Sequence, residues 1–133
     1  MPAQDKKQRL PRTPEAAKAV ADAAMALVAL GDVRAAIVSL LPVWPMPESE
    51  LEALVASTLE QRGRLAARFG GATGTQFVGK RLVAGTLLRL VYLEKFENHA
   101  LRWIFTFYRP AKEWRLNSFH WDDKLAELLD SAR

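Results

Sequence analysis

The 133-residue sequence contains no cysteine, which excludes disulfide bonds, a thiol nucleophile, thiolate-bound zinc and cysteine-ligated iron–sulfur clusters. It has no long hydrophobic run either, because the uncharged stretch 35–47 is short and interrupted by prolines, so no segment is expected to cross a bilayer. No internal repeat, low-complexity tract or Gly-x-Ser-x-Gly nucleophile motif is present. Half of the residues are nevertheless hydrophobic, which at this length predicts one compact domain with a sizeable core.

Candidate metal and phosphate sites are scarce. The sequence has two histidines, His99 and His120, and no recognised ligand spacing joins them to acidic residues, so we expect no metal and no cofactor. The glycine-rich segment 70–74 follows a predicted helix and precedes a predicted strand. Phosphate-binding loops use the reverse order, so this segment predicts only the end of a helix and a loop.

The formal net charge of +4 is unevenly distributed. The segment 14–60 holds two basic and seven acidic residues, whereas 61–115 holds eleven basic and three acidic ones. We therefore expect an anionic partner to meet the basic second half, at the sheet face carrying Arg89, Arg102 and Arg115. The alternative is that this face pairs with an acidic helical surface.

The first residues, 1–13, hold four basic residues and one acidic residue, and we expect a flexible basic tail ahead of a single domain over 14–133. No apolar stretch follows the basic residues, so the tail is not an intact secretory signal. One expectation is an exported, periplasmic protein whose signal has been removed, and the alternative is a cytoplasmic protein.

Three helices are expected first, then four strands and a closing helix. The helix signals are Thr13 as a cap before Pro14, Gly31 as a stop, Asp32 as the cap of a short helix to Leu41, a Ser49–Glu52 capping box, and Gly70 as a stop. The predicted strands cover 75–83, 86–96, 99–109 and 114–121, and Asp122 or Asp123 caps the last helix.

Two turns decide the strand pairing. Gly85 is expected to mark a bulge or tight bend rather than a full turn, and Glu97–Asn98 a two-residue hairpin turn. Helices followed by an antiparallel meander predict an α+β domain with its helices on one face of the sheet.

A resemblance to known proteins is carried by residues 92–103 (YLEKFENHALRW), 105–110 (FTFYRP), Trp114 and 116–119 (LNSF). These residues resemble a group of small uncharacterised bacterial proteins of the NTF2-like (cystatin-like) superfamily. The resemblance is close over roughly the C-terminal half and covers the helices only in outline. It implies a cone in which a curved sheet wraps a helix. It implies little about function, because isomerases, dehydratases and binding domains share this fold.

The order of elements departs from superfamily members in which a short strand interrupts the helices, so a simpler cystatin-like arrangement is the alternative.

The Glu97–Asn98 turn places Glu94 opposite Leu101 and Tyr92 opposite Trp103. Carrying this register through the turn at Pro110 puts one set of residues on a shared face: Leu90, Tyr92, Glu94, Trp103, Phe105, Phe107, Leu116, Ser118 and His120. The polar members of the set form the composition of a pocket for a small apolar or amphipathic ligand. They are Tyr92, Glu94, Trp103, Ser118 and His120. The alternative is a packed interior in which the polar atoms find local partners.

Two function hypotheses follow from this face. We favour a non-catalytic binding or accessory module. The competing hypothesis is a small cofactor-free lyase or isomerase that uses Glu94 and His120 as an acid–base pair. A structure that places these two side chains on opposite faces of the sheet would end the catalytic hypothesis.

The opposite face is expected to be a homodimer interface. It carries an apolar strip edged by arginines, with no predicted helix to cover it: Arg89, Val91, Leu93, Arg102, Ile104, Arg115 and Phe119. Scattered exposed apolar residues are the alternative. Nucleic acid is a disfavoured partner, because the aromatic rings are predicted to point toward the core and the arginines away from them.

Overall fold

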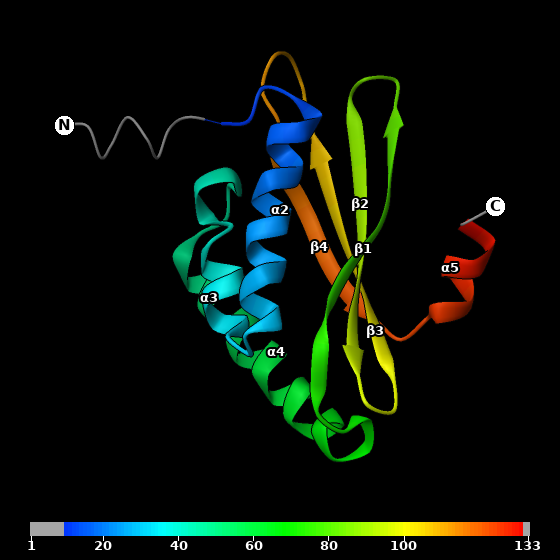
Figure 1. Ribbon diagram of the computed structural model, residues 1–133. Helices are drawn as coiled ribbons and strands as arrows, with labels where there is room; N and C mark the ends of the chain where they lie inside the picture. The colour runs from blue at the N-terminus through cyan, green and yellow to red at the C-terminus, as the bar shows by residue number, and fades with distance from the viewer. Residues whose placement is uncertain (1–9, 132–133) are drawn as a thin grey trace.

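The computed structural model describes residues 10–131 and contains helices, a sheet and a final short helix in that order (Figure 1). The elements are α2 (Pro14–Ala29), α3 (Val33–Val38), the 3₁₀ turn η1 (Leu41–Val43), α4 (Glu48–Phe69), β1 (Ala72–Val83), β2 (Leu87–Phe96), β3 (Ala100–Tyr108), β4 (Arg115–Asp122) and α5 (Leu125–Ser131). The predicted α+β class is confirmed, and the antiparallel sheet is open, with strand order β1-β2-β3-β4. Within residues 10–131, no helix combines the length and apolar character that crossing a bilayer requires.

The first two helices, α2 and α3, start as local sequence signals predict. The Thr13 hydroxyl accepts a hydrogen bond from the Ala16 amide at 3.0 Å, and an Asp32 carboxylate oxygen accepts from the Ala35 amide at 3.0 Å. The Ser49–Glu52 capping box is wrong, because α4 begins before Ser49, directly after the extended residue Pro47, and has no side-chain cap. Proline has no side-chain oxygen, so Pro47 at the N-cap position cannot accept a hydrogen bond from the first amides of the helix.

The core lies between the sheet and the helices α2, α3 and α4, which Figure 1 shows on one side of the sheet. Alanines 17, 21 and 24 recur at helical spacing on the buried side of α2, and their small side chains allow α2 to lie close to β1 and β2. The sheet contributes large apolar side chains that are fully buried: Leu88, Leu90, Phe105, Phe107 and Leu116. We call this the inner face of the sheet, and the opposite side its outer face.

The β1–β2 connection corrects the prediction for Gly85. Val83 pairs with Leu87, so the residues between them form a full hairpin turn, in which Ala84 has φ 55° and Gly85 has φ 65°. Positive φ at successive positions is typical of tight hairpin turns, and glycine adopts it without strain. Because the turn is complete, β1 runs back along β2, and Arg81 lies directly opposite Arg89.

The predicted register of β2 and β3 is confirmed, since Tyr92 pairs with Trp103 and Glu94 with Leu101. Along β4 the predicted register is wrong beyond Leu116, because Asn117 is an extra residue in a β-bulge.

Because of the bulge, every side chain of β4 after Asn117 lies on the face of the sheet opposite to the one predicted from the sequence. Phe119 and Trp121 pair with Phe105 and Trp103 and pack against the core, whereas Ser118 and His120 pair with outer-face residues. The larger apolar area that the two aromatic side chains remove from water favours the bulged register over the regular one.

The folded body includes residues that we predicted to belong to the tail. Residues 1–9 lie outside the described part of the chain. Leu10 packs against the core, Pro11 is buried, and the Pro11 carbonyl accepts a hydrogen bond from the Trp114 amide at 2.7 Å. The domain boundary expected at Pro14 is therefore too late.

Candidate functional site

Tyr92 lies on the inner face as predicted, and its polar atom has a structural partner. Its hydroxyl donates a hydrogen bond to Asp22 of α2 at 2.5 Å, and the side chain is 3% exposed. Burial raises the pKa of the Tyr92 phenol, and the bond to the Asp22 carboxylate raises it further. The phenol therefore stays protonated and joins α2 to β2 rather than exchanging protons with a substrate.

Glu94 and Trp103 also lie on the inner face, where they belong to a buried ion pair. Glu94 is 2% exposed, and its Oε1 accepts hydrogen bonds from Arg62 Nη1 at 2.8 Å and from Trp103 Nε1 at 2.9 Å. Its Oε2 accepts from Arg62 Nη2 at 2.5 Å. Both carboxylate oxygens are thus used by a bidentate guanidinium, a geometry that fixes α4 to the sheet.

Arg62 was missing from the sequence prediction, although a signal for it existed. The buried residues of α4 include Leu51, Val55, Thr58 and Phe69, and position 62 continues the same helical stripe. A charged residue on a buried stripe requires an acidic partner, and Glu94 was the one acid that we placed on the facing side of the sheet.

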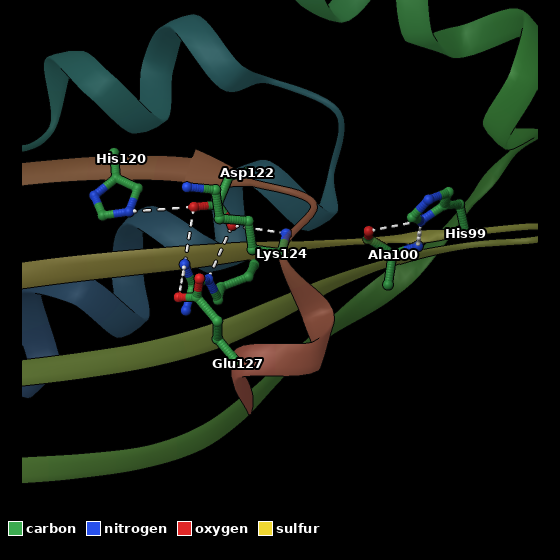
Figure 2. Close-up of polar contacts among 7 residues, drawn as sticks. His99, Ala100, His120, Asp122, Lys124 and Glu127 are labelled. Atoms are coloured by element: carbon green, nitrogen blue, oxygen red, sulfur yellow. Dashed lines mark hydrogen bonds and ion pairs between the residues drawn. The ribbon is translucent and has the colours of Figure 1, made fainter. Parts of the chain in front are cut away.

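Ser118 and His120 are not part of this group. His120 pairs with Ile104 on the outer face, its side chain is 56% exposed, and its Nε2 lies 3.4 Å from Asp122 Oδ2 (Figure 2). Glu94 and His120 therefore lie on opposite faces, which is the arrangement that ends the proposed acid–base pair. The physical reason is the β-bulge at Asn117, which places the side chains of Ser118 and His120 on the outer face instead of the inner face.

Ser118, His120 and Asp122 alternate along one side of β4, in an order that suggests a hydrolytic triad. Among residues 10–131, no hydrogen bond joins Ser118 to His120, and both carboxylate oxygens of Asp122 accept hydrogen bonds from Arg102. The histidine thus lacks the link to a nucleophile that a triad requires.

The predicted dimer interface is altered by α5, which lies on the outer side of the sheet (Figure 1). Arg102 donates to Asp122 at 2.9 and 3.0 Å and lies 3.1 Å from Glu127 of α5. Figure 2 labels Asp122 and Glu127, the two acidic partners. Arg102 and Ile104 are buried within the chain, and Phe119 is on the inner face. The expectation that no helix covers this surface is wrong at the α5 end.

The remaining predicted interface residues keep part of their surface free. Arg89 is exposed, while Val91, Leu93 and Arg115 are half-buried.

Asp122 gives a pH-dependent prediction. Its hydrogen bonds from Arg102 lower the pKa of the Asp122 carboxyl below its ordinary value, so its stabilisation is present above about pH 4 and is lost as the pH falls through the lowered pKa. We expect Asp122→Asn to lower the free energy of unfolding by about 1–2 kcal/mol at neutral pH. In acid the wild type loses the same stabilisation, so the free energies of unfolding of the two proteins should be closer together.

Urea unfolding of both proteins at neutral and acidic pH measures this effect. Asp123→Asn is the matched control, because Asp123 is exposed and its carboxylate has no hydrogen bond or ion pair within the described residues. An equal loss at both pH values would contradict the prediction.

A hollow formed by the helical layer lies away from the sheet. This groove, which we call the η1 groove, has a volume of about 580 Å³. It is formed by α2, the segment before α2, and η1 with its neighbours: Leu10, Pro11, Arg12, Ala16, Ala19, Val20, Ala23, Ser39, Pro42 and Val43. Its lining is apolar except at Arg12 and Ser39.

A second hollow of about 210 Å³ shares Leu10, Pro42 and Val43 with the η1 groove and adds Arg115 to the lining. The Arg115 Nε is buried, and within the described residues it has no hydrogen-bond partner. Buried N–H groups are rarely left unpaired, so this donor marks a place that suits an acceptor.

Sequence reasoning missed the η1 groove because it assigned residues 10–12 to the tail. Among the described residues, no group of three or more histidine, aspartate or glutamate side chains is placed to hold a metal ion. Comparisons with protein-family models, with curated proteins and with solved structures gave no match. The case for a function therefore depends on the geometry of the chain itself.

Proposed function

We propose that the protein is a non-catalytic binding module that holds a small amphipathic anion, an apolar chain ending in a carboxylate, in the η1 groove. The observation that carries the proposal is Arg115, a cation that lines the second hollow beside the groove and whose buried Nε has no hydrogen-bond partner within the described residues. The expected ligand class is retained from the sequence, but its place moves from the inner face of the sheet to the surface of the helical layer.

The groove suits an apolar chain. Its volume of about 580 Å³ falls within the usual range of small-ligand sites. Ala16, Ala19 and Ala23 line one wall from successive turns of α2, and Pro42 and Val43 line the other. A chain lying between these walls would remove apolar surface of both partners from water, which is the main driving force expected for such a ligand.

The second hollow suits the charged end of the ligand. A carboxylate there would pair with the guanidinium group of Arg115, which lines this hollow. Arg12, which lines the η1 groove and not the second hollow, supplies a second cation that attracts an anion. This reading is compatible with the proposed NTF2-like (cystatin-like) ancestry, because that superfamily includes non-catalytic binding domains.

The test is an NMR titration of ¹⁵N-labelled protein with decanoate and with decanol, both kept below micelle-forming concentrations. We expect decanoate to shift the amides of Ala16, Ala19 and Ala23 and the Nε–H of Arg115 in a saturable way. Decanol should bind more weakly, and Arg115→Gln should weaken decanoate binding by about tenfold while leaving decanol unchanged.

Two further variants complete the design. Ala19→Leu places a larger side chain in the groove from the exposed side of α2 and is expected to reduce the binding of both probes. Lys112→Gln removes an exposed cation outside the groove and should change nothing. Absence of saturable binding, or shifts that do not map to the groove, would overturn the proposal.

A further inference from the structure

One row of side chains crosses the whole outer face of the sheet. Arg81 of β1 pairs with Arg89 of β2, Arg89 with Thr106 of β3, and Thr106 with Ser118 of β4. Paired residues in antiparallel strands project to the same side, so two guanidinium groups lie next to each other and two hydroxyl groups follow. We call this set the arginine row.

The two arginines of the row have no acidic partner among residues 10–131. Like charges directly opposite each other on neighbouring strands destabilise a sheet. The contrast with Arg102 on the same face is informative, because that guanidinium is matched by both Asp122 and Glu127. The arginine row therefore concentrates positive charge that the described part of the chain does not neutralise.

The surface is hollowed at this row. A depression of about 260 Å³ is lined by Arg81, Val83, Leu87, Leu88, Arg89 and Thr106. The two guanidinium groups and the Thr106 hydroxyl supply hydrogen-bond donors around it. Val83, Leu87 and Tyr108 border it as exposed apolar side chains, at 45%, 43% and 39% exposure.

We propose that the arginine row binds the phosphate group of a phosphate monoester. Guanidinium groups present paired N–H donors that match phosphate oxygens, and two of them on opposite strands can hold one dianion from two sides. The dianion offsets the repulsion between Arg81 and Arg89. The bordering apolar residues receive the organic group attached to the phosphate, so an aromatic or apolar ester should bind more tightly than free phosphate.

The sequence predicted a homodimer interface on this face. The charges of the arginine row argue against a symmetric dimer centred here. A two-fold interface brings identical surfaces together, which would place the arginine pair of one copy near that of the other. The site is also separate from the η1 groove, because the two hollows share no lining residue. Failure of the decanoate experiment therefore leaves this proposal intact, and the reverse also holds.

The experiment is an NMR titration of the full chain with inorganic phosphate and with phenyl phosphate, at ionic strength held constant with sodium chloride. We expect saturable shifts of the Arg81 and Arg89 Nε–H groups and of the Thr106 amide, with tighter binding of phenyl phosphate. Arg89→Gln and, separately, Arg81→Gln should each weaken binding by at least about tenfold.

Thermal unfolding supplies an independent readout. Phosphate is expected to raise the Tm of the wild type and not that of Arg89→Gln. In chloride alone the variant should be at least as stable as the wild type, because the like-charge repulsion is gone. A variant that lost binding simply by unfolding would have a lower Tm instead. Lys112→Gln, which removes an exposed cation elsewhere, is expected to match the wild type in both measurements.

Three outcomes would overturn the proposal. The first is a set of shifts spread over exposed lysines and arginines, including Lys112, at one common apparent affinity. The second is unchanged binding in both arginine variants. The third is phosphate-independent dimerisation that Arg89→Gln abolishes, which would assign the face to a second copy of the chain.

Discussion

Replacing Glu94 with alanine is expected to lower the free energy of unfolding by about 3–5 kcal/mol, because removing one member of a buried ion pair leaves the other without a partner. Arg62 would lose both of its hydrogen bonds to the carboxylate, and the Trp103 Nε1 would lose its acceptor. Chemical denaturation measures the loss. An effect of this size is a large fraction of the stability of an ordinary domain.

Two other variants make the result interpretable if Glu94→Ala unfolds. Glu94→Gln keeps an acceptor for Trp103 and should cost less. Glu94→Leu combined with Arg62→Met replaces the ion pair by apolar side chains and should recover most of the stability. Glu60→Ala is the control, since its pair with Arg64 is exposed and expected to contribute less than about 1 kcal/mol. A Glu94→Ala protein as stable as this control would refute the structural role.

Replacing Phe119 with alanine is expected to cost about 3 kcal/mol, the second-largest effect we predict. Its ring lies 5.4 Å from that of Trp44, 5.7 Å from that of Trp103 and 6.0 Å from that of Phe105, centroid to centroid. In the regular register expected from the sequence, this side chain would lie on the outer face and its removal would have little effect.

The neighbours of Phe119 provide matched controls. Ser118→Ala and His120→Ala are expected to change the stability by no more than about 0.5 kcal/mol, because both side chains are exposed. Deletion of Asn117 should also be tolerated, since a ladder without the extra residue keeps every later side chain of β4 on its present face. Equal losses for Phe119→Ala and His120→Ala in denaturant titrations would contradict the bulged register.

Much of the fold could be predicted because its signals are local. Thr13 and Asp32 act as helix caps through short hydrogen bonds, and the Glu97–Asn98 turn alone fixes how β2 and β3 pair. What could not be predicted depends on contacts between distant segments. The bulge at Asn117 is favoured by the packing of Phe119 against Trp44, a residue far away in the sequence.

For the candidate sites, too, the features set by local signals could be predicted and those set by distant contacts could not. Tyr92, Glu94 and Trp103 were placed on one face by the hairpin register, but their partners Asp22 and Arg62 come from helices whose position the sequence does not specify. Arg81 was missed because Gly85 was interpreted as a bend rather than a full turn, so no register was derived between its strand and the strand of Arg89.

The alanines of α2 have a consequence for the entropy of binding. Ala16, Ala19 and Ala23 form a wall of the η1 groove, while Ala17, Ala21 and Ala24 hold the same helix against the sheet. Alanine has no side-chain rotamers to lose, so a ligand lying on this wall would order nothing that is not already ordered. The groove is thus preorganised where these alanines line it.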